Sequence, residues 1–233
     1  MTRLLYRWPQ AAKFGRVVPK SKFYEHATVP AVVREKFVAE VQRITWAYKL
    51  AQTTINLPGT TAVPEIQVFQ IDAKGDDVSE PVLTAIDKAV KTPIIFEITR
   101  GDGPERRTRM VAAHKLLSSG APKLGAYYTT DWHPDDADRR PLPTAINLAT
   151  LYTALLEPLT PLAAHPGEEV AEVAARLETV RKLEREVAAL ERRIRTEPQF
   201  NRKIELRRAL LAKQATLADL TSPTSSPTSG TKN

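Results

Sequence analysis

The stretch Val63–Thr99 constrains the fold most strongly, because it reads as a strand, a helix and a second strand. Residues 65–71 alternate polar and apolar side chains, as a half-buried strand does. Apolar residues then recur at helical spacing between Ser79, a suitable N-cap, and Pro93, which ends the helix. Residues 94–98 are an apolar run of strand type. A crossover helix joins parallel strands, so we expect a parallel β-α-β unit.

The size and composition of the chain limit what it can be. Its 233 residues are enough for one α/β domain and an appendage. It has no cysteine, which excludes disulfides and thiolate chemistry. No apolar run approaches the roughly 18 residues needed to span a bilayer, and the N-terminal ten residues are too polar for a signal peptide. We therefore expect a soluble, cytoplasmic protein.

Basic residues are concentrated near both ends of the chain, which has a formal net charge of +7. Residues 1–22 contain six bases and no acids, and residues 181–213 contain eleven bases and five acids. Basic stretches of this kind contact phosphate backbones or acidic partner proteins. A solvated face on a basic protein would show the same composition, so charge alone leaves both interpretations open.

Residues 1–27 are predicted to form a basic, aromatic N-terminal arm. Its aromatic residues either anchor the arm on the core or stack on nucleic-acid bases while neighbouring cations contact phosphates. We expect packing on the core for Trp8, Phe14, Phe23 and Tyr24. The candidate contacts with nucleic acid or a partner in this arm are Lys13, Arg16, Lys20 and Lys22.

Residues 28–160 are predicted to form the α/β domain. A helix is expected over residues 30–51, with Thr28 as its N-cap. Its apolar stripe would consist of Val33, Phe37, Val41, Ile44 and Tyr48. Further strands are expected at 107–116 and 123–130, and their short connections make them antiparallel. The result is an α+β or α/β fold with packed helices and a mixed sheet of about four strands.

Recognisable catalytic motifs are absent from the sequence. It has no GxxxxGK[ST], GxGxxG, HExxH or GxSxG pattern, so we expect no cofactor and no catalytic residues. The acidic stretch Asp131–Asp138 lacks the glycine and the final glutamate of a calcium loop, which favours turn formation over metal binding. A metal-dependent nuclease remains the enzymatic alternative. Its carboxylates and lysine would come from Glu65, Asp72, Glu97 and Lys115.

The C-terminal third has a different character. An apolar helix is expected at 145–156, and prolines then mark the domain boundary. Residues 168–220 contain two amphipathic stretches, which predict an antiparallel, coiled-coil-like helical hairpin. Such a hairpin exposes apolar surface that would dock on its own domain or on a partner. Residues 221–233 are rich in Ser, Thr and Pro and are expected to be disordered.

The hairpin tip holds the second group of candidate contacts. Asn201 is predicted to cap the second helix and Phe200 to staple the turn. The adjacent bases would then project together from an exposed end. The candidate contacts with nucleic acid or a partner here are Asn201, Arg202, Lys203 and Arg207.

Several stretches together resemble a known family. They are FGRVVPKSKFYEHA at 14–27, EIQVFQI at 65–71, VLTAIDKAV at 82–90, PIIFEI at 93–98, TDW at 130–132 and QFNRKIEL at 199–206. In this order they resemble the bacterial domain-of-unknown-function 4391 family over about residues 3–220.

The resemblance implies a genetic setting rather than a reaction. Members of that family are typically encoded beside a helicase-like ATPase, a restriction-type helicase and a site-specific DNA methyltransferase. We therefore expect a non-catalytic accessory subunit of a restriction-like anti-phage defence complex, with the ATPase and the methyltransferase as partners. Double-stranded DNA is a further candidate partner. The alternatives are a metal-dependent nuclease effector and a stand-alone nucleic-acid-binding protein.

Overall fold

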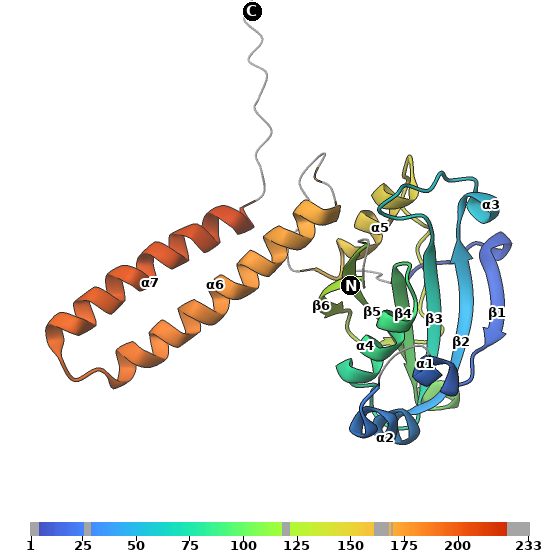
Figure 1. Ribbon diagram of the computed structural model, residues 1–233, viewed down its shortest axis with the longest axis horizontal. Coiled ribbons are helices and arrows are strands. Elements are labelled where there is room, and N and C mark those ends of the chain that lie inside the picture. Colours follow the sequence, from blue (N-terminus) through green and yellow to red (C-terminus); the bar gives the residue numbers. More distant parts are fainter. Residues whose placement is uncertain (1–4, 26–28, 118–121, 161–167, 169, 223–233) are drawn as a thin grey trace, which may run out of the picture. The chain divides into compact units, whose positions relative to one another are not determined.

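The computed structural model describes residues 5–25, 29–117, 122–160, 168 and 170–222 (Figure 1). The chain divides into two units, Met1–Pro161 and Leu162–Asn233, and each is described by itself. The first unit holds a mixed sheet with its helices, and the second holds a pair of long helices (Figure 1). None of the helices in the described ranges is long and apolar enough to cross a membrane.

The sheet has seven strands in the described part of the chain. Six of them lie side by side in sequence order: β1 (Lys13–Val17), β2 (Val41–Leu50), β3 (Ile66–Ala73), β4 (Ile94–Arg100), β5 (Arg107–Leu116) and β6 (Lys123–Thr129). The short strand β7 (His133–Pro134) pairs with β5. Strands β3 and β4 are parallel and all other pairs are antiparallel. The expectation of about four strands was too low, because it missed β1, β2 and β7.

The parallel unit predicted from the sequence is confirmed. Helix α4 (Glu80–Ala89) connects β3 to β4, and Gln70 of β3 lies in register with Glu97 of β4. Ser79 occupies the N-cap position, but its side chain makes no capping hydrogen bond. The later strands, β5 and β6, are also antiparallel as predicted.

The helix predicted over residues 30–51 is wrong in its second half. Helix α2 (Ala31–Glu40) ends where strand β2 begins, and Pro30 occupies its N-cap position, whereas the predicted cap, Thr28, lies outside the described residues. Two irregularities shift the register between β2 and β3. The buried positions of β2 therefore recur every third residue, at Val41, Ile44, Ala47 and Leu50. This spacing imitates a helical stripe, although the β-branched and aromatic residues of the segment favour a strand.

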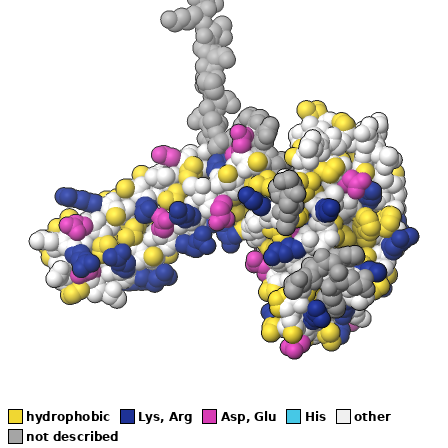
Figure 2. All heavy atoms as spheres, in the orientation of Figure 1, with side chains coloured by type: hydrophobic (Ala, Val, Ile, Leu, Met, Phe, Trp, Pro, Cys, Tyr) yellow, Lys and Arg dark blue, Asp and Glu magenta, His cyan; other side chains and the backbone are white. Residues whose placement is uncertain are grey.

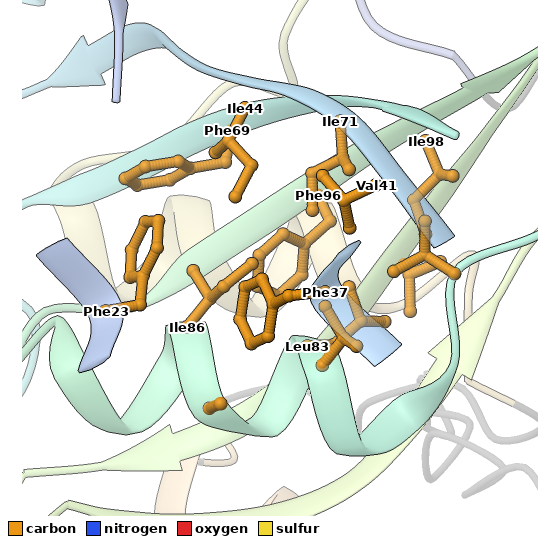
Figure 3. Close-up of a cluster of buried hydrophobic side chains, with 14 of the residues drawn as sticks. Phe23, Phe37, Val41, Ile44, Phe69, Ile71, Leu83, Ile86, Phe96 and Ile98 are labelled. Carbon is orange, nitrogen blue, oxygen red and sulfur yellow. The ribbon is translucent and has the colours of Figure 1, made fainter. Parts of the chain in front are cut away.

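One face of the sheet is covered by α1 (Ser21–Glu25), α2 and α4 (Figure 1). Figure 3 shows the side chains of Phe23, Phe37 and Phe96 gathered there with Leu83 and Ile86 of α4. All of these side chains are buried, and they form the main hydrophobic core.

The remaining elements of the first unit are short. They are η1 (Gln10–Ala12), α3 (Gln52–Ile55), η2 (Gly103–Glu105) and α5 (Leu148–Leu156). Helix α5 begins at an N-cap, Asn147, whose side chain accepts a hydrogen bond from the Thr150 amide. It packs on β5, where the Tyr152 hydroxyl donates a 2.5 Å hydrogen bond to the carbonyl of Ala113.

The second unit consists of α6 (Val170–Thr196) and α7 (Phe200–Thr221). Arg176 reaches the carbonyl of Leu220, and Lys213 pairs with Glu186, so the two helices run antiparallel, as predicted. The capping prediction at the tip is wrong. Helix α7 begins one residue earlier than Asn201, and the predicted staple residue, Phe200, keeps 74 % of its surface exposed. The tail beyond residue 222 lies outside the described residues.

The turn between α6 and α7 is organised by Glu197 instead. Its carboxylate accepts a hydrogen bond from the Gln199 amide (3.1 Å) and lies 3.7 Å from the guanidinium of Arg202. A carboxylate near the first turn of a helix interacts favourably with the exposed amides there. Glu197 therefore provides the side-chain hydrogen bond at the start of α7 that the sequence had suggested for Asn201.

Candidate nucleic-acid interface

Strand β1 forms one edge of the sheet, and all five of its residues are exposed. Its register with β2 pairs Arg16 with Trp46 and contains an irregularity between Lys13 and Arg16. Gly15 lies within this irregularity with φ of +66°, a conformation that side chains rarely adopt. The edge therefore presents two cations, Lys13 and Arg16, on a strand whose outer side has no neighbour within the sheet.

A row of aromatic rings runs from this edge into the core. The Phe14 ring lies 4.2 Å from Trp46, and Trp46 is stacked on Phe69 with centroids 6.0 Å apart. The row continues through Phe23 to Phe37, with centroid separations of 6.4 and 6.2 Å. Phe14 keeps 41 % of its surface exposed, whereas Phe37 is fully buried. The rigid core thus supports an exposed ring.

The packing predicted for the arm's aromatic residues holds for some of them. Trp8 and Phe23 are buried. Phe14 is exposed, and the guanidinium of Arg16 lies 5.2 Å from its ring centroid. The side chain of Tyr24 lies outside the described residues. Phe14 and Arg16 together show the pairing of ring and cation that suits a nucleic-acid strand.

A pocket of about 530 Å³ lies beside this aromatic row. Its wall is aromatic, and its rim is basic. The residues that give it this character are the aromatic Phe23, Trp46 and Phe69 and the basic Arg16, Lys22 and Lys91. Among the candidate contacts predicted for the arm, Arg16 and Lys22 therefore line one cavity.

The polar residues of the pocket are tied to one another. The side-chain carbonyl of Gln67 accepts a 2.9 Å hydrogen bond from Trp46 Nε1. Its amide nitrogen donates to Glu65 and to the Thr92 hydroxyl, both at 3.1 Å. The Glu65 carboxylate also pairs with Lys49 at 2.7 Å. Gln67 therefore fixes the indole of Trp46, and Lys49 neutralises the acid in the lining.

The C-terminal end of α4 forms part of the pocket wall, and a buried lysine donates hydrogen bonds to the carbonyls there. Lys115 Nζ donates to the carbonyls of Asp87, Val90 and Thr92 at 2.8, 2.9 and 2.9 Å. It also pairs with the Asp87 carboxylate at 2.6 Å, which accepts a further 2.6 Å hydrogen bond from Tyr127. Burial lowers the pKa of Lys115 and raises the pKa of Asp87, and their pairing opposes both shifts. The ammonium offsets the negative end of the helix dipole at this place.

The other candidate contacts of the arm have different surroundings. Lys20 donates to the carbonyls of Phe37, at 3.1 Å, and of Val41 at the C-terminal end of α2. Burial lowers the pKa of Lys20, and the nearby charge of Lys74 adds to this effect. Lys20 thus closes the end of a helix, whereas Lys13 lies exposed on β1.

The candidate contacts at the hairpin tip lie in the second unit. Asn201, Arg202 and Arg207 are exposed and Lys203 is half-buried, all within the first turns of α7. Figure 2 shows further Lys and Arg side chains spread along the visible face of this unit. These residues form a basic surface that belongs to the second unit.

The four nuclease candidates are not brought together. Glu97 is fully buried on the face of β4 opposite α4 and accepts hydrogen bonds from Trp8 (2.8 Å) and Arg139 (2.6 Å). Lys115 lies on the α4 face, and Glu65 lines the pocket there. In the described ranges, no group of three or more His, Cys, Asp or Glu residues could hold a metal ion.

Asp72 is held in a separate ionic cluster on the same face as Glu97. It accepts a 2.7 Å hydrogen bond from Thr99 and pairs with Arg43 (2.7 Å) and Arg106 (3.1 Å). Burial opposes ionisation, but the Thr99 hydrogen bond and the two arginines hold the pKa of Asp72 below its usual value. Asp135, from the acidic stretch 131–138, joins this cluster through Arg106 and forms the turn expected there.

The sequence reasoning missed two residues of the pocket. Trp46 was placed in the predicted helix, so its position beside β1 was not visible. Lys91 directly follows the last turn of α4, and the only available signal was a base just before the Thr92-Pro93 stop. Strand pairing, rather than sequence proximity, brings these residues together.

The comparison with protein families agrees with the resemblance found in the sequence. The model of the domain of unknown function DUF4391 matches residues 7–217. The chain belongs to the DUF4391 family. The match spans both DUF4391 units, the sheet and most of the helical pair. No curated protein and no solved structure matches the chain.

Proposed function

We propose that this DUF4391 chain is a non-catalytic accessory subunit of a bacterial anti-phage defence complex and contacts nucleic acid through the β1 edge. The observation that carries the nucleic-acid contact is the exposed Phe14 ring, which packs against Trp46 with ring centroids 4.2 Å apart and has the Arg16 guanidinium beside it. Stacking of a base on an aromatic side chain contributes about 1–3 kcal/mol and depends little on sequence. The cations of the edge add a salt-dependent attraction to phosphates.

The proposed assembly with partner proteins rests on the family resemblance and on the helical pair. The family resemblance suggests a helicase-like ATPase and a DNA methyltransferase as partners, in the cytoplasm. The helical pair offers a surface for them, because α7 exposes Phe200 and Leu211 beside its bases. Helices that expose apolar and basic side chains together suit partner grooves with acidic rims.

The nucleic-acid contact is tested with labelled single-stranded DNA in a binding titration. Phe14→Ala should weaken binding about fivefold or more, because it removes one stacked ring. A matched control is Val32→Ala, which shortens another exposed apolar side chain, on α2. Equal affinity of the Phe14 variant and the control variant would contradict the proposed edge contact.

The assembly is tested by a pull-down of the tagged protein from its native host, with and without nuclease treatment. Recovery of a helicase-like ATPase and a methyltransferase in both samples would support a protein-held complex. Recovery of nucleic acid alone, lost after nuclease treatment, would contradict the subunit role and leave a stand-alone nucleic-acid-binding protein.

A further inference from the structure

We propose that the pocket beside β1 binds one unpaired nucleotide, with its base against the aromatic wall and its phosphate at the basic rim. The inference deepens the proposed function and rests on it, because it names the form of nucleic acid that the first unit selects. The ligand chemistry is a nucleobase joined to a phosphate, either within a single strand or as a free nucleotide.

The size and wall of the pocket fit a base. Its volume of about 530 Å³ lies within the range of small-ligand pockets, about 300–1,000 Å³. The wall is formed by the half-buried Trp46 and by the small accessible parts of Phe69 and Phe23, which each keep 3 % of their surface exposed. A base in a duplex has both faces covered by its neighbours, so only an unpaired base can offer its surface to such a wall.

The charges around the pocket favour an anion. Arg16 and Lys91 line it, whereas the acid in the lining, Glu65, is paired with Lys49 at 2.7 Å. The partial negative charge at the carbonyl end of α4 would repel a phosphate. The buried ammonium of Lys115 offsets this charge, because it donates hydrogen bonds to three carbonyls there. The rim therefore keeps a positive potential beside an apolar wall.

The wall is fixed before a ligand arrives. Trp46 is held by its hydrogen bond to Gln67 and by stacking on Phe69, with the two rings only 10° from parallel. Gln67 is itself buried and bonded to Thr92 at the end of α4. A preformed site loses little side-chain freedom on binding, which favours affinity.

The test compares three probes: a labelled single-stranded oligonucleotide, the corresponding duplex and a free mononucleotide. Binding is followed by polarisation and by tryptophan emission, since Trp46 lines the pocket. We expect the single strand to bind at least tenfold more tightly than the duplex and to quench the emission. The quenching should be lost in Trp46→Leu. Lys91→Gln should weaken single-strand binding about fivefold and lower the salt slope by about 0.7.

Lys123→Gln is the matched control, because Lys123 is also exposed but lies on β6, at the other edge of the sheet. Lys91→Gln leaves the aromatic wall intact, so it remains informative if Trp46→Leu fails to fold. Competition by the mononucleotide would support a free nucleotide as ligand, and quenching by the strand alone would support a strand-borne base.

Two results would overturn the inference, and they differ in meaning. If the single strand binds but Lys91→Gln and Trp46→Leu bind as the wild type does, the pocket is not the site and the edge contact of Phe14 stands. If none of the three probes binds the full chain, the nucleic-acid part of the proposed function fails as well.

Discussion

Replacement of Lys115 by methionine should strongly destabilise the first unit. Methionine has a similar length and fills the same space, but it leaves the carbonyls of Asp87, Val90 and Thr92 without their donor and the Asp87 carboxylate without its partner. Removal of one partner of a buried ion pair costs about 3–5 kcal/mol. In a unit of this size, each kcal/mol lowers Tm by about 2–4 °C, so we expect a decrease of roughly 6–20 °C.

The measurement is thermal unfolding of the full chain at several pH values, followed by circular dichroism. In the variant, burial without a counter-charge raises the pKa of Asp87 above its unfolded value. Protonation then restores stability below the unfolded pKa, and this contribution is lost as the pH rises through the folded pKa. The deficit should therefore be smaller in acid than at neutral pH.

A double variant separates the charge from the packing. Asp87→Asn combined with Lys115→Met removes the unpaired carboxylate while leaving a side chain that accepts the Tyr127 hydrogen bond. It should recover part of the lost stability. A loss below about 1 kcal/mol in Lys115→Met, or no recovery in the double variant, would refute the assigned role of this ion pair.

Three further predictions concern other polar contacts. Asp72→Asn should make stability depend less on pH in acid. The lowered pKa of Asp72 adds stability above the unfolded pKa, and this stability is lost as the pH falls through the folded pKa. An unchanged dependence between about pH 2 and pH 5, the range around the reference pKa of an aspartate, would contradict this. Trp8→Phe removes one of the hydrogen-bond donors to the buried Glu97 and should cost about 1.5–3 kcal/mol in denaturant unfolding, with Trp132→Phe as the comparison. Lys20→Met should lower the free energy of unfolding by about 1–2 kcal/mol, whereas Lys13→Met should leave it unchanged. Equal effects of the two substitutions would show that the hydrogen bonds from Lys20 to the end of α2 do not stabilise the protein.

The predictable parts of the fold are those encoded by local patterns. The β3-α4-β4 unit follows from period-two and helical spacing with Pro93 as a stop, and α6 and α7 follow from their amphipathic stripes. Strand β2 was missed because its register shifts place buried residues at every third position. No local pattern reports such a shift, since it exists only in the pairing with β3.

The candidate site was less predictable than the fold. The bases Arg16 and Lys22 were among the contacts predicted from the sequence, whereas Phe14 was expected to pack on the core. Their assembly with Trp46, Gln67 and Lys91 depends on β1 pairing with β2 and on the end of α4. The sequence therefore indicates that this surface is basic and aromatic. The pocket itself could not be predicted, because it depends on which strands pair.

The two lysine-closed helix ends have a consequence for the order of folding. Helices α2 and α4 are each ten residues long, which is too short for stability in isolation. Their last carbonyls are bonded by Lys20, which follows β1, and by Lys115 of β5. The last carbonyls of each helix therefore gain their donor only when a residue from another part of the chain is in place. Peptides cut from these segments should remain unstructured, and this face of the protein should form in one cooperative step.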